Sequence, residues 1–353
     1  MLGGTVKIPQ CVIAKIGWIP RLLTPWILAG CHPADSTGPL STLVWSSVSS
    51  PPTQYLYGIW GTSASDVWAV GRDYNGGTIL HYNGATWSSV ASGTTNTLLG
   101  IWGSSASDVW AVGGSFTILH YNGTSWSGVS SGINSTSLTS VWGTSASDVW
   151  ALSVGGYPYP LSGGILHYDG KTWSSVSVPF PAPPLRSIWG TSPSDVWAVG
   201  SGGGPGGTPM VLHYNGSVWS GVSGPDTQVG FYGVWGTSAS DVWAAGTYYV
   251  PGTILNYGTI LHYDGRSWSS TQIPTTLIPT MYSLNSVWGT SASDVWAVGH
   301  PGSGTGTIFH YNGISWQSIS VGTAVLNGVW GSSASDVWAV GDGGMILHGS
   351  PPG

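Results

Sequence analysis

The chain has 353 residues, of which 23 are Trp and 56 are Gly, while only 6% are charged and none is Glu. So many aromatic residues exclude a disordered chain, because disordered segments are poor in aromatic side chains and rich in charge. The formal net charge of −6 and the scarcity of Lys and Arg exclude a nucleic-acid binder, which needs a basic surface to contact phosphates. Long charged helices are excluded by the same scarcity.

The first thirty residues differ from the rest of the chain. Lys7, Lys15 and Arg21 precede a short apolar run, "LLTPWILAGC", at 22–31. Basic residues before a short apolar run predict a secretory signal rather than a membrane span, which needs about 20 apolar residues. We therefore expect a signal peptide over residues 1–30 and an exported protein.

The end of this run, Leu28-Ala29-Gly30-Cys31, resembles a bacterial lipobox. The resemblance implies cleavage before Cys31 and acylation of its thiol; a plain secretion signal with an incidental Cys is the alternative. After cleavage Cys31 is the only cysteine, so no internal disulfide can form. We expect a linker over 31–40 and a protein anchored by lipid in the cell envelope, at the outer membrane or cell surface, or secreted.

The phrase "GTSASDVWAVG", first found at 61–71, recurs with little change to the end of the chain. Seven copies spaced 40 to 53 residues apart predict one repeat array rather than separate domains. The Trp of "DVW" marks the copies and lies at Trp68, Trp110, Trp150, Trp197, Trp243, Trp296 and Trp338. A second Trp in "(V/I)WG" precedes each mark, and a third follows "HY(N/D)G" in the first six copies.

Each unit contains four short segments rich in aromatic and β-branched residues, separated by Gly, Asn, Asp and Ser. This pattern is typical of strands joined by turns. In the first unit the segments lie around "GIWG", "DVWAVG", "TILHY" and "TWSSV", and the "NG" between the last two is a strong hairpin signal. Four antiparallel strands in each of seven units predict an all-β fold, a seven-bladed β-propeller over residues 41–349.

The two ends of the array complement each other. The seventh copy stops after "MILH" (345–348) and lacks a fourth strand, while "LVWSSV" (43–48) precedes the first copy without three strands of its own. We expect the N-terminal strand to pair with the last one and to close the ring. Residues 350–353 are then a C-terminal tail.

One Asp and one His recur in every copy. The Asp ends the turn between the first two strands, where its side chain can accept backbone N–H groups; these residues are Asp66, Asp108, Asp148, Asp195, Asp241, Asp294 and Asp336. The His lies in the third strand, where we expect its ring to bond to the turn backbone or to the neighbouring Asp; these residues are His81, His120, His167, His213, His262, His310 and His348.

We expect these repeated residues to be structural and to hold no metal. One carboxylate per blade is too few for Ca²⁺, and one His per blade does not make a zinc cluster. WD-repeat propellers use an Asp, His and Trp network, to which this unit is similar in its ingredients though not in their order. The segment "HYDGKTW" (167–173) resembles the structural Asp-box of sialidase-type propellers, with one residue fewer between Asp and Trp.

The sequence shows no catalytic constellation, so we expect neither an enzyme nor a cofactor. Glycosidases need paired carboxylates with different pKa values. Sialidases also carry an arginine cluster and a Tyr–Glu pair, whereas this chain has no Glu, and Arg72, Arg186 and Arg266 lie in different units. A glycoside hydrolase or sialidase-like enzyme remains a weaker alternative, with Asp73 and Asp342 as its candidate carboxylates.

The copies differ mainly in the connections after the second and fourth strands, which lie on one face of the predicted disc. The second-to-third connection ranges from "GSFT" (114–117) to "TYYVPGTILNYGT" (247–259). Function concentrates in variable loops on rigid scaffolds. The candidate ligand-binding residues on this face are Tyr74, Tyr157, Tyr159, Tyr248, Tyr249, Tyr257 and His300.

Aromatic side chains with few charges suit neutral glycans or protein surfaces. The architecture is similar to that of bacterial propeller lectins, and the repeat wording resembles that of secreted propeller proteins of δ-proteobacteria such as myxobacteria, which mostly have no assigned activity. These resemblances imply a monomeric, non-catalytic surface module, adhesin-like or lectin-like. The alternative is a protein–protein scaffold in an envelope assembly. No nucleic-acid partner is expected.

Overall fold

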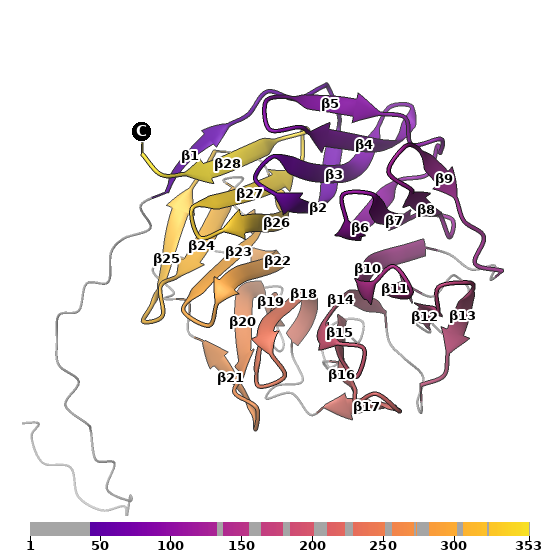
Figure 1. Cartoon of the computed structure of the whole chain (residues 1–353). Coiled ribbons are helices and arrows are strands. Elements are labelled where there is room, and N and C mark those ends of the chain that lie inside the picture. The colour runs from indigo at the N-terminus through magenta and orange to yellow at the C-terminus, as the bar shows by residue number, and fades with distance from the viewer. Residues whose placement is uncertain are drawn as a thin grey trace, which may run out of the picture. The chain divides into compact units, whose positions relative to one another are not determined.

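The computed structural model describes residues 43–132, 137–154, 164–178, 184–200, 210–222, 229–250, 256–271, 273, 282–301, 306–322 and 325–352. All of them lie in the unit Gly38–Gly353. They form 28 strands in seven sheets, each with four antiparallel strands, and the sheets surround a central axis (Figure 1). The predicted seven-bladed β-propeller is therefore confirmed.

The first strand of each sheet lies innermost: β2 (Tyr55–Ser63), β6 (Leu98–Ser105), β10 (Ser137–Ser145), β14 (Leu185–Ser192), β18 (Val229–Ser238), β22 (Tyr282–Ser291) and β26 (Leu326–Ser333). The second strands are β3 (Asp66–Asp73), β7 (Asp108–Gly113), β11 (Asp148–Val154), β15 (Asp195–Gly200), β19 (Asp241–Tyr249), β23 (Asp294–Pro301) and β27 (Asp336–Gly341). The third strands are β4 (Gly76–Tyr82), β8 (Ile118–Tyr121), β12 (Gly164–Tyr168), β16 (Met210–Tyr214), β20 (Asn256–Tyr263), β24 (Thr307–Tyr311) and β28 (Ile346–Ser350). The outer strands are β5 (Trp87–Val90), β9 (Trp126–Gly128), β13 (Trp173–Val176), β17 (Trp219–Val222), β21 (Trp268–Thr271), β25 (Trp316–Ser320) and β1 (Val44–Ser47).

The ring closes through the two ends of the array, as predicted. Strand β1 pairs with β28 and completes the sheet of β26 and β27, with Trp45 opposite Gly349 and Ser47 opposite Leu347 (Figure 1). The innermost strands contact one another around the whole circle, including β2 with β26. The last blade thus contains strands from both ends of the propeller sequence.

Each second strand is the most buried element of its sheet. In β7, Val109, Ala111 and Val112 are fully buried, and Trp110 is 2% exposed. Trp110 and Val112 pack against Val141 of the next blade. A run of consecutive apolar residues is what a strand buried on both faces needs, and the segment that begins with "DVWA" supplies it in every copy.

The Trp residues join neighbouring blades. The ring of Trp68 lies 4.0 Å from that of His81 in its own blade, centroid to centroid, and 5.6 Å from that of Trp126 in the next blade. The two indoles meet edge to face, an arrangement that aromatic quadrupoles favour. The same inter-blade pair recurs in every blade: Trp45–Trp296, Trp87–Trp338, Trp110–Trp173, Trp150–Trp219, Trp197–Trp268 and Trp243–Trp316.

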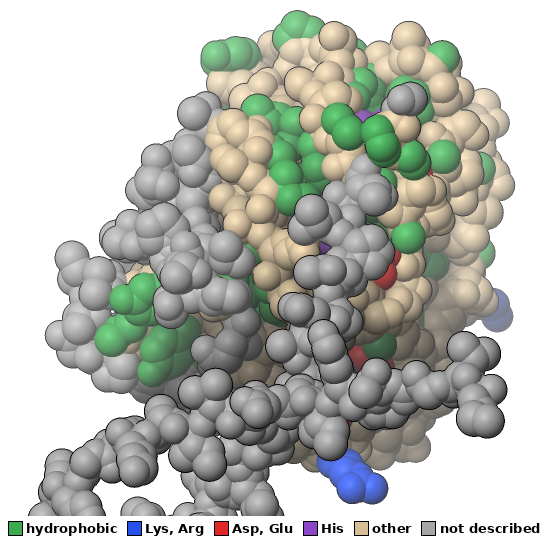
Figure 2. Space-filling view, turned by 90° about the vertical axis from the view of Figure 1, so that its left-hand side faces the viewer, with side chains coloured by type: hydrophobic (Ala, Val, Ile, Leu, Met, Phe, Trp, Pro, Cys, Tyr) green, Lys and Arg blue, Asp and Glu red, His purple; other side chains and the backbone are tan. Residues whose placement is uncertain are grey.

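The surface is poor in charge, as the composition requires. Figure 2 shows the side at the left of Figure 1, where separate groups of apolar side chains lie among polar and backbone atoms and charged side chains are few. Among the described residues, none forms a helix with the length and apolar character that spanning a bilayer would require.

Within the segment 247–259, expected to be a long loop, residues 247–249 and 256–259 belong to strands β19 and β20. The ladder between β19 and β20 continues outward, with Thr247 opposite Gly258 and Tyr248 opposite Tyr257. Thr and Tyr favour a pleated, half-buried strand, and the two facing Tyr residues form a cross-strand pair. The ladder between β19 and β20 therefore continues beyond Gly246.

Candidate functional site

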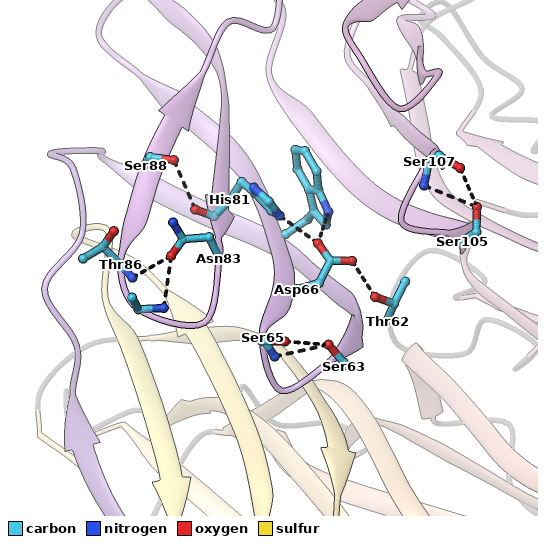
Figure 3. A network of polar contacts seen from close by, with 12 residues as sticks. Thr62, Ser63, Ser65, Asp66, His81, Asn83, Thr86, Ser88, Ser105 and Ser107 are labelled. Carbon is cyan, nitrogen blue, oxygen red and sulfur yellow. Dashed lines mark hydrogen bonds and ion pairs between the residues drawn. The ribbon is translucent and has the colours of Figure 1, made fainter.

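The Asp of each repeat is the centre of a polar network (Figure 3). In the first blade, Oδ1 of Asp66 accepts hydrogen bonds from Nε2 of His81 at 2.7 Å and from Nε1 of Trp68 at 3.2 Å, while Oδ2 accepts one from Oγ1 of Thr62. The His–Asp bond is present in all seven blades at 2.6 to 2.7 Å. Each network joins three strands of one sheet.

In three blades the equivalent donors lower the pKa of the carboxyl group. Burial raises the pKa of Asp148, but the hydrogen bonds from His167 and Thr144 and the charge of His167 outweigh it, so the pKa lies below its ordinary value. The same opposing causes lower the pKa of Asp294 and of Asp336. These carboxylates are ionised acceptors that hold strands together.

The expectation that the repeated Asp caps the turn backbone is wrong. Three side-chain donors occupy the carboxylate of Asp66, and the turn N–H of Ser65 is bonded to Oγ of Ser63 (Figure 3). The backbone-capping turn is found instead in the next hairpin, where Oδ1 of Asn83 accepts from the N–H groups of Ala85 and Thr86.

The networks form no metal site. The part of the chain that the structure describes holds no group of three or more His, Cys, Asp or Glu side chains arranged to bind a metal ion. Each His–Asp pair belongs to a single blade. The His–Asp pair is therefore one structural device repeated in all seven blades.

The central axis is where the blades differ. Each innermost strand carries a β-bulge near its first residues, where the register against the second strand shifts by one residue. A bulge redirects the side chain of its extra residue. The bulged positions, here named the bulge ring, hold seven side chains: Tyr57, Leu99, Thr139, Arg186, Tyr232, Asn285 and Asn327.

The bulge ring lines a cavity of about 230 Å³ on the axis of the propeller. In the first blade the bulge lies between Leu56 and Gly58, which pair with Gly71 and Val70 close to the end of β3. The cavity therefore lies near the face that carries the second-to-third-strand connections. This face is the one on which the sequence predicts binding.

Three members of the bulge ring join adjacent blades. Nδ2 of Asn327 donates to the carbonyl oxygen of Leu56 at 3.0 Å, Nδ2 of Asn285 donates to that of Leu326 at 3.0 Å, and Oγ1 of Thr139 donates to that of Leu185 at 3.0 Å. Each bond satisfies a carbonyl beside the bulge of the following blade. These three residues have a structural role that Tyr57, Leu99, Arg186 and Tyr232 do not share.

The phenols around the cavity are partly desolvated. The hydroxyls of Tyr232 and Tyr249 lie 3.0 Å apart, and burial, followed by this hydrogen bond, raises the pKa of Tyr249, which nearby Arg186 lowers in part. Burial also raises the pKa of Tyr57, against the opposing charge of Arg72. Both phenols are therefore neutral hydrogen-bonding groups at physiological pH.

The structure separates the candidate residues expected from the sequence. Tyr74 is 90% exposed at the tip of the β3–β4 turn, and His300 is exposed on β23. Tyr248 packs against the core between the fourth and fifth blades and pairs with Tyr257. Only Tyr249 bonds to a bulge-ring residue. Tyr157, Tyr159 and Cys31 lie outside the described residues.

Sequence reasoning missed the bulge ring because it compared only the loops. The signal is present in the innermost segments, which read "YGIWG", "LGIWG", "TSVWG", "RSIWG", "YGVWG", "NSVWG" and "NGVWG". Their last four residues are nearly constant, while the first residue is Tyr, Leu, Thr, Arg or Asn. Within these segments, the bulge position is therefore the one at which the seven blades differ most.

No family model matches the sequence, and no curated protein resembles it significantly in sequence. Among solved structures, the chain is similar to YCF48 bound to D1 peptide, with 16% identity, a TM-score of 0.64 and coverage of 87% of this chain and 97% of the other. YCF48 from Cyanidioschyzon merolae is 16% identical, with a TM-score of 0.64 and coverage of 87% of this chain and 99% of the other. The WD40 β-propeller domain of Doa1 is 11% identical, with a TM-score of 0.63 and coverage of 87% of this chain and 96% of the other. Fold and repeats together define a closed seven-bladed β-propeller built from Trp-rich units.

Proposed function

We propose that this propeller is a non-catalytic interaction module that binds a segment of a partner protein at the mouth of the central cavity. One observation carries the proposal: the innermost strands are nearly identical except at the bulge ring, where chemically different side chains converge. Packing alone would be served by seven equal residues. A ring of unequal side chains on a rigid scaffold is what recognition of an asymmetric partner needs.

The comparisons support a protein partner. YCF48, which has a similar fold, has been solved bound to a D1 peptide. The WD40 domain of Doa1 and the WD40 repeats of RRP9 also have a fold similar to that of this chain. The absence of catalysis is proposed because the carboxylates of the repeats are occupied as structural acceptors, as for Asp66 and His81.

Glycan binding, as in an adhesin or lectin, is a second candidate and has one observation in its favour. A cleft of about 390 Å³ between the second and third blades is lined by Trp110, Trp173, Tyr168 and Lys171. Aromatic walls with polar neighbours are typical of sugar sites. However, Trp110 is 2% and Trp173 6% exposed, so neither presents an open ring face for a sugar to stack on.

The expected signal peptide, residues 1–30, bears on where the protein acts. We propose that the module acts outside the cytoplasmic membrane, anchored through a lipid on Cys31 or secreted. The resemblance of residues 28–31 to a lipobox supports this location. A partner would then be an envelope or extracellular protein.

Photo-crosslinking in the producing cells tests the proposal. A photoreactive phenylalanine analogue replaces Tyr57 at the cavity or, as the control, Ser65 on the face with the repeated turns. We expect a discrete protein adduct from position 57 and none from position 65. Equal adducts from both positions, or no protein adduct from position 57 while a glycan array gives a defined hit, would overturn it.

A further inference from the structure

The basic residues of the described chain are few and are distributed unevenly. They are Arg72, Lys171, Arg186 and Arg266. Lys171 and Arg266 lie in exposed β-turns beside Asp169 and Asp264, whose charge they partly balance. The guanidinium of Arg72 lies over the ring of Tyr55, 4.8 Å from its centroid. Arg186 is the remaining one, and it lines the central cavity.

Arg186 has no acidic partner in the described structure. The ion pairs among the described residues are the seven His–Asp pairs of the repeats. The residues lining the cavity include no Asp, so Arg186 is its only charged lining residue. The carboxylate of Asp342 accepts a hydrogen bond from the lining residue Asn327 but does not itself line the cavity. The charged group that lines the cavity is therefore a cation.

A second donor lies on the adjacent blade. Arg186 and Tyr232 hold the bulge positions of the neighbouring strands β14 and β18, and both line the cavity. The hydroxyl of Tyr232 lies 3.0 Å from that of Tyr249. Two hydroxyls that share one hydrogen bond use one hydrogen between them, so the other hydrogen can be donated to a ligand. A guanidinium with five N–H donors and an adjacent phenol O–H together match the acceptor oxygens of a carboxylate.

The volume of the cavity limits the size of the group that can enter it. About 230 Å³ is smaller than the roughly 300–1,000 Å³ of pockets that enclose drug-sized molecules. It accommodates one side chain or one chain end. The apolar side chain of Leu99 and the ring of Tyr57 supply the opposite wall.

From these observations, and resting on the proposed function, we propose that Arg186 binds a carboxylate of the partner segment, with the Tyr232–Tyr249 pair supplying one auxiliary O–H donor. The carboxylate is that of an Asp or Glu side chain or of a free C-terminus. The other residues of the bulge ring then contact the flanking part of the segment.

Three pools of random nonapeptides test this inference on the folded propeller. The first has a fixed central Asp and an amidated C-terminus, the second a fixed central Asn and an amidated C-terminus, and the third a central Asn and a free C-terminal carboxylate. Retention on immobilised protein is measured by mass spectrometry. Arg186→Gln is compared with Arg266→Gln, which removes the same charge from an exposed turn of the opposite face.

We expect the first or the third pool to be retained at least tenfold better than the second on the native protein and on Arg266→Gln. The preference should fall to about one on Arg186→Gln. Arg186→Lys should restore only part of it, because an ammonium cannot form the two parallel bonds of a guanidinium. The pool that is preferred identifies the source of the carboxylate.

Two outcomes overturn the inference and differ in what they say of the proposed function. Equal retention of all pools on the native protein and on Arg186→Gln shows peptide binding without carboxylate recognition, so the proposed function survives alone. Retention of no pool removes the inference, and the crosslinks from position 57 then decide the proposed function. Unchanged thermal unfolding of Arg186→Gln confirms that the fold is intact.

Discussion

Trp330, in the last blade, lies directly against Gly61, in the first. A Cβ atom built on Gly61 would be 2.8 Å from Cη2 of Trp330 and 2.5 Å from the carbonyl oxygen of Asp66. The same contact joins every neighbouring pair of blades, as for Trp60 and Gly103. The "WG" dipeptide of each repeat thus contacts both neighbouring blades. Its indole packs against the glycine of the next blade, and its glycine packs against the indole of the preceding blade.

Gly61→Ala should destabilise the protein by about 1–3 kcal/mol, the usual cost of adding a methylene to a well-packed core. The added methyl group collides with backbone as well as with the indole, so a shift of the side chain alone cannot relieve it. Urea unfolding followed by Trp fluorescence measures the effect. Gly128→Ala is the matched control, because nothing lies within 4 Å of a Cβ there. Equal stabilities of the two variants would contradict the joint.

Trp45→Ala should weaken the closure of the ring. Strand β1 is held to β28 by its ladder and by the contact of Trp45 with Trp296, not by a hairpin. Loss of a buried Trp side chain costs up to about 3–5 kcal/mol, and Trp45 is only half-buried, so the lower part of this range or less is expected. Faster unfolding and proteolysis near residue 43 are the readouts. Trp126→Ala, the equivalent in a hairpin-connected blade, should unfold more slowly than Trp45→Ala.

The lowered pKa values of Asp148, Asp294 and Asp336 predict a loss of stability in acid. Because the folded-state pKa is below the ordinary value of 3.8, the stabilisation is complete above pH 3.8 and is lost as the pH falls through the folded-state pKa. The free energy of unfolding, measured from pH 6 to pH 2.5, should decrease below pH 3.8. Asp148→Asn should decrease less steeply over this range. A pH-independent difference between the two proteins would be contrary to the prediction.

Asn327→Ala should cost about 1–3 kcal/mol, because it leaves the carbonyl of Leu56 and the carboxylate of Asp342 without the amide donor. Arg186→Ala changes the equivalent bulge position, which makes no hydrogen bond to a described residue, and should alter stability by less than about 0.5 kcal/mol. Thermal unfolding of the two variants is the measurement. A larger loss for Arg186→Ala would show that Arg186 is a structural residue.

Cys31→Ser should abolish lipid attachment if the lipobox resemblance of residues 28–31 holds. Metabolic labelling with a fatty acid should mark the native protein and not the variant, and the native protein should fractionate with membranes. Labelling of Cys31→Ser, or an N-terminus other than residue 31 in the mature native protein, would contradict it.

The fold was predictable because each blade is built from a pattern of neighbouring residues, including the "WG" dipeptide, that the sequence repeats seven times. The number of copies gives the blade number, and the order of segments within a copy gives the strand order. The pairing of residues 43–48 with 345–348 follows because the last copy lacks the fourth strand that the N-terminal segment supplies. The partnership of His81 with Asp66 was one of two expected outcomes. Residues 247–259 were expected to be a connection between strands, but Tyr248 and Tyr257 pair with each other and extend the ladder into this segment.

By itself, the sequence determined a closed ring of seven sheets, because each four-strand repeat has apolar faces that only identical neighbouring blades can bury. Only the tertiary structure decided where those blades stop being identical. A bulge is a register between two strands, and the cavity is a meeting of seven positions about forty to fifty residues apart, so neither exists until the ring has closed. In the closed ring Arg186 and Tyr232 line the same cavity, and the hydroxyl of Tyr232 lies 3.0 Å from that of Tyr249.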